Sequence, residues 1–221
     1  MERVLDVLIS GLAIIILCPI LLPIFLVLRF TGEGEIFYLQ PRIGYKGETF
    51  SIIKLATMLK NSENIGAGTL TLKKDPRVLP VGKFLRKSKI NELPQLFNIL
   101  IGDMSLVGPR PLVPEGESFY SKKESEIIRS VRPGVTGIGS LVLRDEESYY
   151  AHRHDAHEFY KTVISPYKAS LEIWYVENKT FFLNIKIIFF TALAIVNPAY
   201  LVEKHFKNLP KMPTKLENSK E

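Results

Sequence analysis

The pattern of apolar and polar positions divides the chain into an apolar N-terminal segment and a mixed remainder. From Val7 to Leu28 nearly every residue is apolar, and about 20 apolar residues are enough to cross a bilayer. The run is too long for the core of a signal peptide, and no small-residue cleavage site follows it. We therefore expect residues 1–32 to be embedded in a membrane, either as a straight spanning helix or as a helix that enters, bends and returns.

Two prolines favour the bent form. Pro19 and Pro23 lie inside the apolar run, and an interior proline removes a backbone donor and clashes with the preceding turn. We expect a sharp kink near Cys18 and Pro19. Arg3 and Arg29 flank the segment without a strong positive-inside asymmetry, as expected if both ends face the cytoplasm.

Beyond Gly32 the pattern becomes mixed, which predicts a helix-rich α/β (α+β) globular domain over residues 33–200. Residues 36–40 and 49–55 are β-rich runs separated by turn signals at Gly44 and Gly47, so they predict a hairpin. Residues 61–71 are expected to form a loop. Residues 140–147 are interpreted as a strand running into a solvated turn.

A short apolar helix is predicted after residue 90. Its apolar positions recur at i, i+3, i+4 and i+7, which indicates one buried face: Leu93, Leu96, Phe97 and Leu100. Asn91 is a suitable N-cap and Gly102 a natural C-terminal stop. Glu92 would then lie at the helix N-terminus, where free N–H groups and the helix dipole favour phosphate and a metal bound to it.

The C-terminal part is apolar and aromatic from Leu171 to Val196. Its uninterrupted run, 187–196, is too short to span a bilayer, so an interfacial amphipathic helix or a core helix is expected. Asn197 and Pro198 should end this helix. Residues 201–221 form a lysine-rich tail that is predicted to be mobile.

Composition adds the sign of the charge and the redox setting. The net charge of +6 and a pI near 9.3 imply anionic partners. Residues 73–89 hold seven cations and one acid, either as a solvated face or as a surface for acidic headgroups, which contribute about 1 kcal/mol per cation. This stretch lacks the interleaved aromatics of a nucleic-acid platform. A single cysteine excludes a disulfide framework and a cysteine-based zinc site.

Two arginines lie on stiff backbone. Arg110 stands between Pro109 and Pro111, and Arg132 precedes Pro133, so their backbone angles are restricted. A guanidinium matches phosphate bidentately, and two such groups suit a diphosphate. Three nearby histidines are interpreted as part of a surface helix rather than as zinc ligands, because no partner stands at fixed helical spacing: His152, His154 and His157.

The motifs in order resemble those of the bacterial sugar transferases, the monotopic phosphoglycosyl transferases. The resemblance covers most of the chain and is carried by these segments: Gln40-Pro41-Arg42-Ile43-Gly44, Lys54 before Thr57-Met58, Asn91-Glu92-Leu93-Pro94-Gln95-Leu96, Gly102-Asp103-Met104-Ser105, Gly108-Pro109-Arg110-Pro111 and Arg132-Pro133-Gly134-Val135-Thr136-Gly137. It implies a small catalytic domain on the cytoplasmic face of the bacterial inner membrane, anchored by a re-entrant helix. The implied reaction transfers a sugar 1-phosphate from a nucleotide diphosphate sugar, expected to be a UDP-sugar, to polyprenyl (undecaprenyl) phosphate, which initiates lipid-linked glycan synthesis.

The resemblance also implies roles for individual residues. Glu92 would hold Mg²⁺, and four cations would bind substrate phosphates: Lys54, Arg86, Arg110 and Arg132. Membrane lipids are expected partners, nucleic acid is not, and a homodimer is an open alternative. In the family an aspartate attacks the sugar phosphate, and nucleoside monophosphate leaves before the lipid phosphate collects the phosphosugar.

This chain departs from the family at the nucleophile, because Asn91 occupies the position of the family aspartate. An amide is neutral and a poor nucleophile, so the usual acyl phosphate cannot form. Four explanations are open: another carboxylate attacks, with Asp145, Glu146 and Asp103 as candidates; the lipid phosphate attacks directly; the chain is an inactive nucleotide-sugar binder or partner of other glycan-assembly enzymes; or Asn91 is an engineered substitution.

Overall fold

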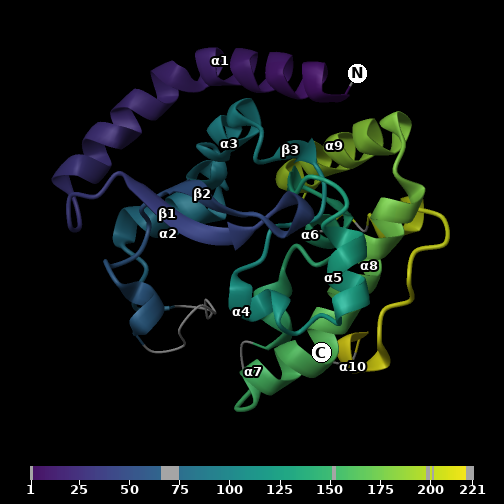
Figure 1. Ribbon diagram of the computed structural model, residues 1–221. Helices are drawn as coiled ribbons and strands as arrows, with labels where there is room; N and C mark the ends of the chain where they lie inside the picture. The colour runs from purple at the N-terminus through teal and green to yellow at the C-terminus, as the bar shows by residue number, and fades with distance from the viewer. Residues whose placement is uncertain (1, 66–74, 151–152, 198–199, 201, 218–221) are drawn as a thin grey trace. The chain divides into compact units, whose positions relative to one another are not determined.

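The computed structural model describes residues 2–65, 75–150, 153–197, 200 and 202–217. These residues fall into two compact units. Unit 1 comprises Met1–Gln40 and Ser51–Gly102, and unit 2 comprises Pro41–Phe50 and Asp103–Glu221. The fold is helix-rich with few and short strands (Figure 1), so the mixed α/β class predicted from the sequence is confirmed.

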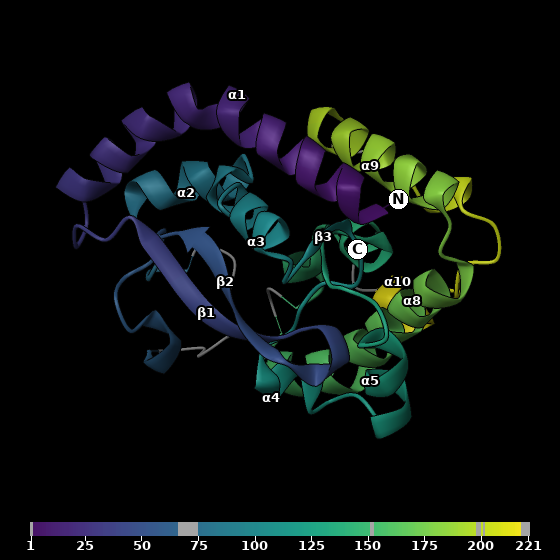
Figure 2. The same ribbon diagram turned by 45° about the horizontal axis from the view of Figure 1, so that its top comes forward.

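The N-terminal helix α1 runs from Glu2 to Phe30 without a break, with Pro19 and Pro23 inside it. It is long and apolar enough to cross a membrane. Figures 1 and 2 both show α1 as a bent rod rather than a straight one, as its interior prolines lead one to expect. Most of its large apolar side chains are exposed, and Leu21 and Leu28 are exceptions that pack inward.

Unit 1 is built on a β-hairpin. Strands β1 (Phe37–Ile43) and β2 (Thr49–Leu55) pair with each other, which confirms the predicted hairpin; its tip belongs to unit 2. Helix α2 (Pro80–Lys87) and helix α3 (Gln95–Ile101) follow, and α3 packs against α1. The predicted loop at 61–71 contains a 3₁₀ turn at Ser62–Asn64, and its remainder lies partly outside the described residues.

The core of unit 1 joins these elements through apolar contacts. Leu28 of α1, Leu55 of β2 and Leu85 of α2 are each 1% exposed and form one cluster. Partly buried apolar residues complete this cluster: Ile24, Phe25, Ile36, Val81 and Ile90. The end of α1 is therefore fixed to the hairpin that carries Lys54.

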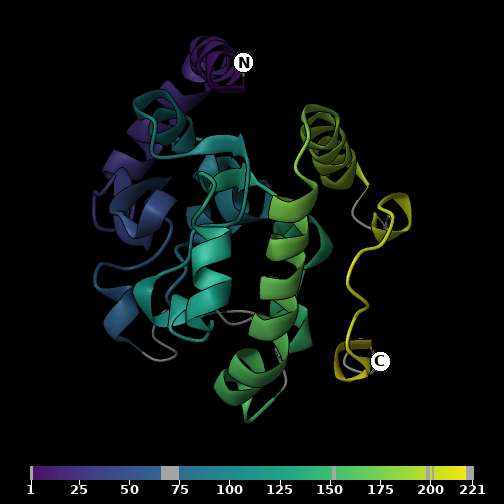
Figure 3. The same ribbon diagram turned by 45° about the vertical axis from the view of Figure 1, so that its right-hand side comes forward.

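Unit 2 contains a short parallel sheet surrounded by helices. Strand β3 (Ser105–Val107) pairs with β4 (Gly134–Thr136) in the register Ser105 to Gly134 and Val107 to Thr136. The helices of this unit are α4 (Pro114–Glu117), α5 (Lys122–Ile128), α6 (Ile138–Val142), α7 (Ala156–Phe159), α8 (Ser165–Asn178), α9 (Phe181–Val196) and α10 (Thr214–Glu217). Helix α8 packs against α5 and α6, and Figure 3 shows α5 and α8 side by side.

Helix α6 corrects the strand predicted at 140–147. Residues Ile138–Val142 are helical, and Ile138, Leu141 and Val142 are buried. These positions are i, i+3 and i+4, the spacing of one helix face. A run of only five residues fits a strand as well as one face of a helix. Packing of α6 against α8 and α9 favours the helix.

Helix α9 has both buried and exposed apolar side chains. Thr180 caps α9 by accepting the Leu183 N–H at 3.1 Å, and α9 ends at Asn197, as predicted. Ile187 and Phe190 are buried, whereas one side of α9 leaves large apolar residues in solvent: Phe182, Phe189, Ile195 and Val196. This division is typical of an interfacial helix. Beyond α9, Val202, Phe206 and Leu216 are buried.

Candidate active site

Unit 1 brings together two of the predicted site residues. Lys54 lies on β2 and Glu92 ends a 3₁₀ turn, η3 (Ile90–Glu92). Lys54 Nζ lies 3.8 Å from Glu92 Oε1, and the two side chains are 15% and 16% exposed. An ion pair with this little solvent is screened less than a surface pair. The pair therefore offers a cation and an oxygen ligand side by side at a partly open position.

Asn91 does not cap a helix, contrary to the prediction. It lies inside η3, and α3 begins only at Gln95, with Pro94 as its N-cap residue. Lys89 adopts a left-handed φ of 60°, so the chain turns sharply before η3, and Pro94 cannot supply a backbone N–H. Glu92 thus precedes α3 rather than lying in its first turn. The prediction that the α3 dipole favours phosphate and metal binding at Glu92 is therefore not supported by the structure. The predicted stop at Gly102 is confirmed, with φ of 111°.

The Asn91 side chain is buried and incompletely paired. It is 6% exposed, and its Oδ1 has no hydrogen-bond partner among the described residues. Four residues later, Gln95 is 1% exposed and its Nε2 is likewise unpaired. An unpaired buried polar atom costs about 1–3 kcal/mol. Two such atoms beside Glu92 mark this turn as a place where stability is not optimised.

Asn98 fixes the distance between β2 and the turn that carries Glu92. Its Oδ1 accepts the Ile53 N–H at 2.9 Å, and its Nδ2 donates to the Ser51 carbonyl at 2.8 Å. This polar face of α3 was not predicted, because the apolar spacing pointed to Phe97, which is 38% exposed. The amide links α3 to the strand segment immediately before Lys54.

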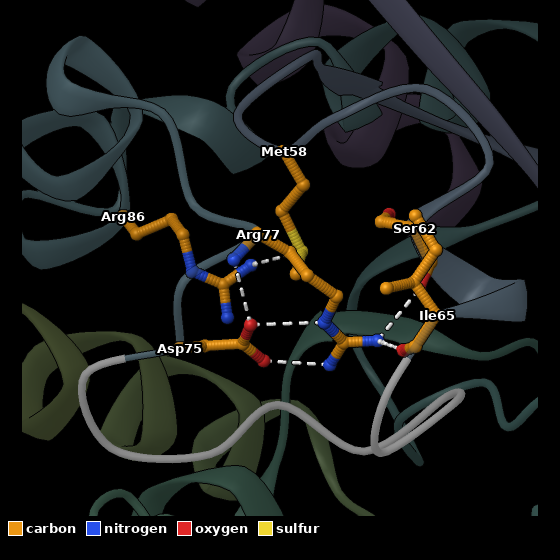
Figure 4. A network of polar contacts seen from close by, with 6 residues as sticks. All are labelled: Met58, Ser62, Ile65, Asp75, Arg77 and Arg86. Atoms are coloured by element: carbon orange, nitrogen blue, oxygen red, sulfur yellow. Dashed lines mark hydrogen bonds and ion pairs between the residues drawn. The ribbon is translucent and has the colours of Figure 1, made fainter.

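Arg86, the predicted phosphate-binding residue of α2, lies beside a buried network (Figure 4). Its Nη1 is 3.8 Å from Met58 Sδ. In the same network Asp75 accepts from Arg77 Nε at 2.9 Å and Nη2 at 2.6 Å, and Arg77 Nη1 donates to the carbonyls of Ser62 and Ile65.

This network corrects part of the predicted basic face at 73–89. Arg77 is 4% exposed and Asp75 5% exposed, so their charges satisfy each other and the local backbone rather than solvent. Lys83, Lys87 and Lys89 are exposed, as a solvated face requires. Lys73 and Lys74 lie outside the described residues.

Unit 2 places the two predicted arginine turns next to each other. Gly108 N–H donates to the Thr136 carbonyl, and Gly134 N–H donates to the Pro109 carbonyl, both at 2.9 Å. Arg110 follows the first turn and is half-buried, whereas Arg132 precedes the second and is exposed. The Arg132 guanidinium lies 5.4 Å from the centre of the Tyr45 ring. Parallel pairing of β3 with β4 thus positions both cations from adjacent chain segments.

The carboxylates of unit 2 that are candidate nucleophiles differ in their exposure and in their ion pairing. Asp145 is exposed and Asp103 is half-buried. Glu146 Oε2 accepts from Lys168 Nζ at 2.7 Å. Burial lowers the pKa of the Lys168 ammonium, but the charges of Glu146 and Tyr160 more than offset it, so the pKa is raised. Glu146 is therefore committed to a buried ion pair.

The predicted surface character of the histidines agrees with the structure where it is described. His157 lies on α7 with its side chain 59% exposed, 3.5 Å from Glu115. His152 lies outside the described residues. Within residues 2–65, 75–150, 153–197 and 202–217, no three His, Cys, Asp or Glu side chains form a group that could hold a metal ion.

A cleft of about 550 Å³ also opens in unit 2. Ile43, Tyr120 and Arg129 are among its lining residues, with Glu117 paired to Arg129. None of the residues predicted for the site lines this cleft.

Sequence reasoning missed Glu172, a buried acid on α8. Its side chain is close to Arg110, whose backbone N–H it accepts at 3.3 Å. Only one signal marked it: a lone acid within the apolar run Leu171-Glu172-Ile173. Acids in such runs are commonly exposed breaks in a helix, and Glu172 is 2% exposed.

The chain is similar to known proteins over most of its length. Residues 1–198 match the family model described as bacterial sugar transferase. The chain is 34% identical over 208 residues to the exopolysaccharide production protein ExoY of Sinorhizobium fredii, covering 88% of this chain and 84% of that protein.

Two further relatives carry names that state an activity. The undecaprenyl-phosphate glucose phosphotransferase of Komagataeibacter xylinus is 33% identical over 202 residues, which cover 86% of this chain and 35% of that protein. The UDP-glucose:undecaprenyl-phosphate glucose-1-phosphate transferase of Klebsiella pneumoniae is 32% identical over 194 residues, with 86% and 39% covered. The chain therefore spans less than half the length of these two relatives.

Proposed function

The chain belongs to the bacterial sugar transferase family, and on that premise we propose that it transfers a sugar 1-phosphate from a UDP-sugar to undecaprenyl phosphate. The product would be the first lipid-linked intermediate of a surface or secreted glycan. The observation that carries the proposal is the Lys54–Glu92 pair in the motif region that the family match includes. The names of the relatives support the same donor and acceptor classes.

The residues around Glu92 fit Mg²⁺ as a cofactor. Mg²⁺ prefers oxygen ligands and is commonly held by one or two carboxylates together with substrate phosphates. Glu92 supplies one partly exposed carboxylate, and the neighbouring Asn91 supplies an amide oxygen without a partner among the described residues. Glu92 would hold the ion. When bound, Mg²⁺ neutralises negative charge on the diphosphate.

The cations of the chain have a separate task, which is to bind and orient the diphosphate. The proposed phosphate-binding residues are those that the family resemblance implies: Lys54, Arg86, Arg110 and Arg132. Arg110 and Arg132 suit bidentate binding of phosphate oxygens, whereas Lys54 acts as a point charge already oriented by Glu92.

We favour direct attack by the lipid phosphate. An oxygen of undecaprenyl phosphate forms a bond to the sugar-bearing phosphorus of the UDP-sugar, the bond from that phosphorus to the bridging oxygen breaks, and UMP leaves with the electron pair. Asn91 cannot take the family aspartate's place as nucleophile, because an amide is a poor nucleophile. Asp145 and Asp103 remain the alternative nucleophiles, since Glu146 is engaged by Lys168.

The membrane arrangement that we propose is a re-entrant α1, with the catalytic domain on the cytoplasmic face of the bacterial inner membrane. The support comes from the bend of α1, a helix that contains Pro19 and Pro23, and from its exposed apolar side chains. The acceptor's phosphate lies at a membrane surface, so a site anchored there meets it directly.

The test is release of UMP by the purified full chain. The chain in detergent is incubated with Mg²⁺, undecaprenyl phosphate and a panel of UDP-sugars, with EDTA-treated samples as controls. We expect UMP release with one or a few sugars, dependent on both lipid and Mg²⁺. No release with any nucleotide sugar would contradict the proposal.

A second function, nucleotide-sugar binding without transfer, is favoured by one observation. Asn91 is an amide where the family has its nucleophile, and its Oδ1 is buried and unpaired among the described residues. This alternative predicts that UDP-sugar binds to the chain, that Arg110→Ala abolishes binding, and that no UMP appears. Calorimetric titration beside the release assay separates the two functions.

A further inference from the structure

The Arg110 turn depends on a single backbone donor. Pro109 and Pro111 have no N–H group, so between Gly108 and Leu112 only Arg110 can donate a backbone hydrogen bond. Its N–H donates to Glu172 Oε1 at 3.3 Å. The side chain of Glu172 thus holds the one donor that this turn offers.

The Glu172 side chain is buried and tightly packed where it meets the Arg110 turn. The side chain is 2% exposed, and its Oε2 has no hydrogen-bond partner among the described residues. A Cβ atom at position 139 would collide with Glu172 Oε1, so Gly139 leaves room for the carboxylate. Gly137 leaves similar room for the Gly108 carbonyl. The carboxylate therefore lies among three fixed segments: α8, the start of α6 and the Arg110 turn.

The opposite side of the turn is held by the tip of the hairpin. Arg42 Nη1 donates to the Pro111 carbonyl at 3.1 Å, and the Ile43 N–H donates to the Leu112 carbonyl at 3.0 Å. Glu172 thus holds the N–H of Arg110, and Arg42 and Ile43 hold the carbonyls of the two residues that follow it.

A buried carboxylate with one long hydrogen bond is a poor way to stabilise a fold. Replacing buried charges by apolar residues of similar volume is often neutral or stabilising. Burial raises the pKa of the Glu172 carboxyl to about 7, against the opposing effects of the Arg110 N–H and the charges of Lys168 and Arg110. The unfavourable location indicates a role other than stability.

We propose that Glu172 is the positioning residue of Arg110: by accepting the Arg110 N–H it fixes the turn so that the guanidinium meets the diphosphate of the nucleotide sugar. This inference rests on the proposed function, because it assigns Arg110 to that substrate. Glu172 itself touches no substrate in this role. Its loss should weaken binding of the donor without removing a group that takes part in the chemistry.

Two variants separate positioning from simple packing. Glu172→Gln keeps the length and an acceptor oxygen, whereas Glu172→Met keeps the length and loses the acceptor. The control is Glu177→Met, the same change at an exposed position on the same helix. For each full-length variant in detergent, the measurements are KM and kcat for UMP release, the Kd for the UDP-sugar, and the melting temperature.

We expect Glu172→Met to raise KM and Kd by about tenfold, because the Arg110 turn loses the acceptor of its N–H and no longer holds the guanidinium in place, while kcat changes by less than about threefold. The KM of Glu172→Gln should lie within about threefold of the KM of the natural chain. Glu177→Met should alter neither constant. A purely structural role predicts a lower melting temperature with unchanged KM and Kd, and that result would overturn the inference.

The two proposals fail in different ways. If the natural chain releases UMP and Glu172→Met keeps its KM and Kd, the positioning role is wrong and the transfer function stands. If the natural chain binds UDP-sugar without releasing UMP, the transfer function is wrong and the Kd series alone decides the role of Glu172. If no UDP-sugar binds to the natural chain, both are wrong.

Discussion

Individual side chains in this protein show how one kind of group takes different tasks in different surroundings. Glu92 is partly exposed and lies beside Lys54, the setting from which its role as a cation ligand is proposed. Glu146 is neutralised by Lys168. Glu172 is buried with one backbone donor, so its charge is disfavoured. The surroundings, rather than the residue type, distinguish the proposed metal ligand Glu92, the structural partner Glu146 and the proposed positioning residue Glu172.

Asn91→Asp tests the reaction route at the residue scale. A carboxylate at position 91 restores the nucleophile of the family, next to Glu92. We expect the natural chain to release UMP only when undecaprenyl phosphate is present. Asn91→Asp should release about one UMP per enzyme molecule without lipid, in a rapid burst, because a covalent phosphosugar accumulates. Rapid-quench measurement with labelled UDP-sugar detects the burst.

The same experiment decides against direct attack if the natural chain itself releases UMP without lipid. In that case Asp145→Asn is the next variant, because Asp145 is an exposed carboxylate of unit 2. Loss of the lipid-independent release in that variant would identify Asp145 as the substitute nucleophile.

Glu172 makes folding dependent on pH. Its carboxyl has a pKa of about 7 in the folded chain, raised by burial from 4.5, with Arg110, Lys168 and Tyr120 as the neighbouring titratable groups. Between pH 4.5 and 7 the folded chain keeps a proton that the unfolded chain has lost. The free energy of unfolding therefore falls as pH rises through this window, and the loss is complete above it.

Glu172→Gln should remove this dependence. At pH 8 we expect the variant to be more stable than the natural chain by about 3 kcal/mol, and at pH 4 the difference should be small. Denaturant unfolding in detergent at the two pH values measures it, with the exposed Glu177→Gln as control. A stability difference that is equal at both pH values would contradict the assigned ionisation.

The sequence predicts charged candidate residues for the site but not the buried polar ones. Motif and charge point to Lys54 and Glu92, and the structure places these two side chains next to each other. Asn98 and Glu172 could not be assigned, because a polar residue in a helical pattern looks the same whether it faces solvent or a backbone group. Only tertiary contacts tell these two cases apart.

At the element scale, local chemistry predicted the boundaries that depend on glycine, asparagine and turn residues. The hairpin, the stop at Gly102 and the end of α9 at Asn197 follow from turn and capping preferences. The 3₁₀ turn at Ile90–Glu92 and the five-residue α6 do not, because such short elements have little propensity of their own. Packing against longer neighbours determines them.

Asn98→Ala tests how α3 is held against β2. The variant leaves the Ile53 N–H and the Ser51 carbonyl without their partner, so we expect a loss of about 2–4 kcal/mol in the free energy of unfolding. Asn178→Ala is the control, since that exposed amide only donates to the Trp174 carbonyl of its own helix. Equal effects of the two changes in denaturant unfolding would show that Asn98 is not a structural link.

Variants of Asp75 and Arg77 test whether their buried ion pair stabilises unit 1. Arg77→Met leaves the Asp75 charge buried and unpaired, and we expect a loss of about 3–5 kcal/mol. The double variant Asp75→Leu with Arg77→Met should recover part of that loss. The matched control is Arg153→Met, because Arg153 and Asp155 form a pair of the same sequence spacing whose side chains are 39% and 56% exposed.

The melting temperature is compared for four proteins: the natural chain, Arg77→Met, the double variant Asp75→Leu with Arg77→Met, and Arg153→Met. Arg153→Met should leave the melting temperature nearly unchanged, since exposed pairs contribute little. If Arg77→Met behaves like Arg153→Met, the buried network does not stabilise unit 1 in solution.

At the scale of the whole molecule, apolar surface is distributed over both units. Unit 1 carries α1, and unit 2 carries α9, and each presents large apolar side chains to solvent. A soluble protein rarely leaves such continuous apolar surface exposed. Each unit therefore has an element suited to a membrane, and the net charge of +6 favours an anionic lipid surface.

The topology of α1 is the whole-molecule property that separates a spanning helix from a re-entrant one. Cys18 is the only cysteine, so Cys18→Ser gives a background without thiols. Into it we place one reporter cysteine at a time, Glu2→Cys before the apolar run and Glu48→Cys after it. Because a re-entrant helix leaves both ends on the cytoplasmic side, we expect a membrane-impermeant maleimide to label neither reporter in intact spheroplasts and both after permeabilisation. Labelling of Glu2→Cys alone in intact spheroplasts would mean that the helix spans the bilayer and that its interior prolines only kink the span.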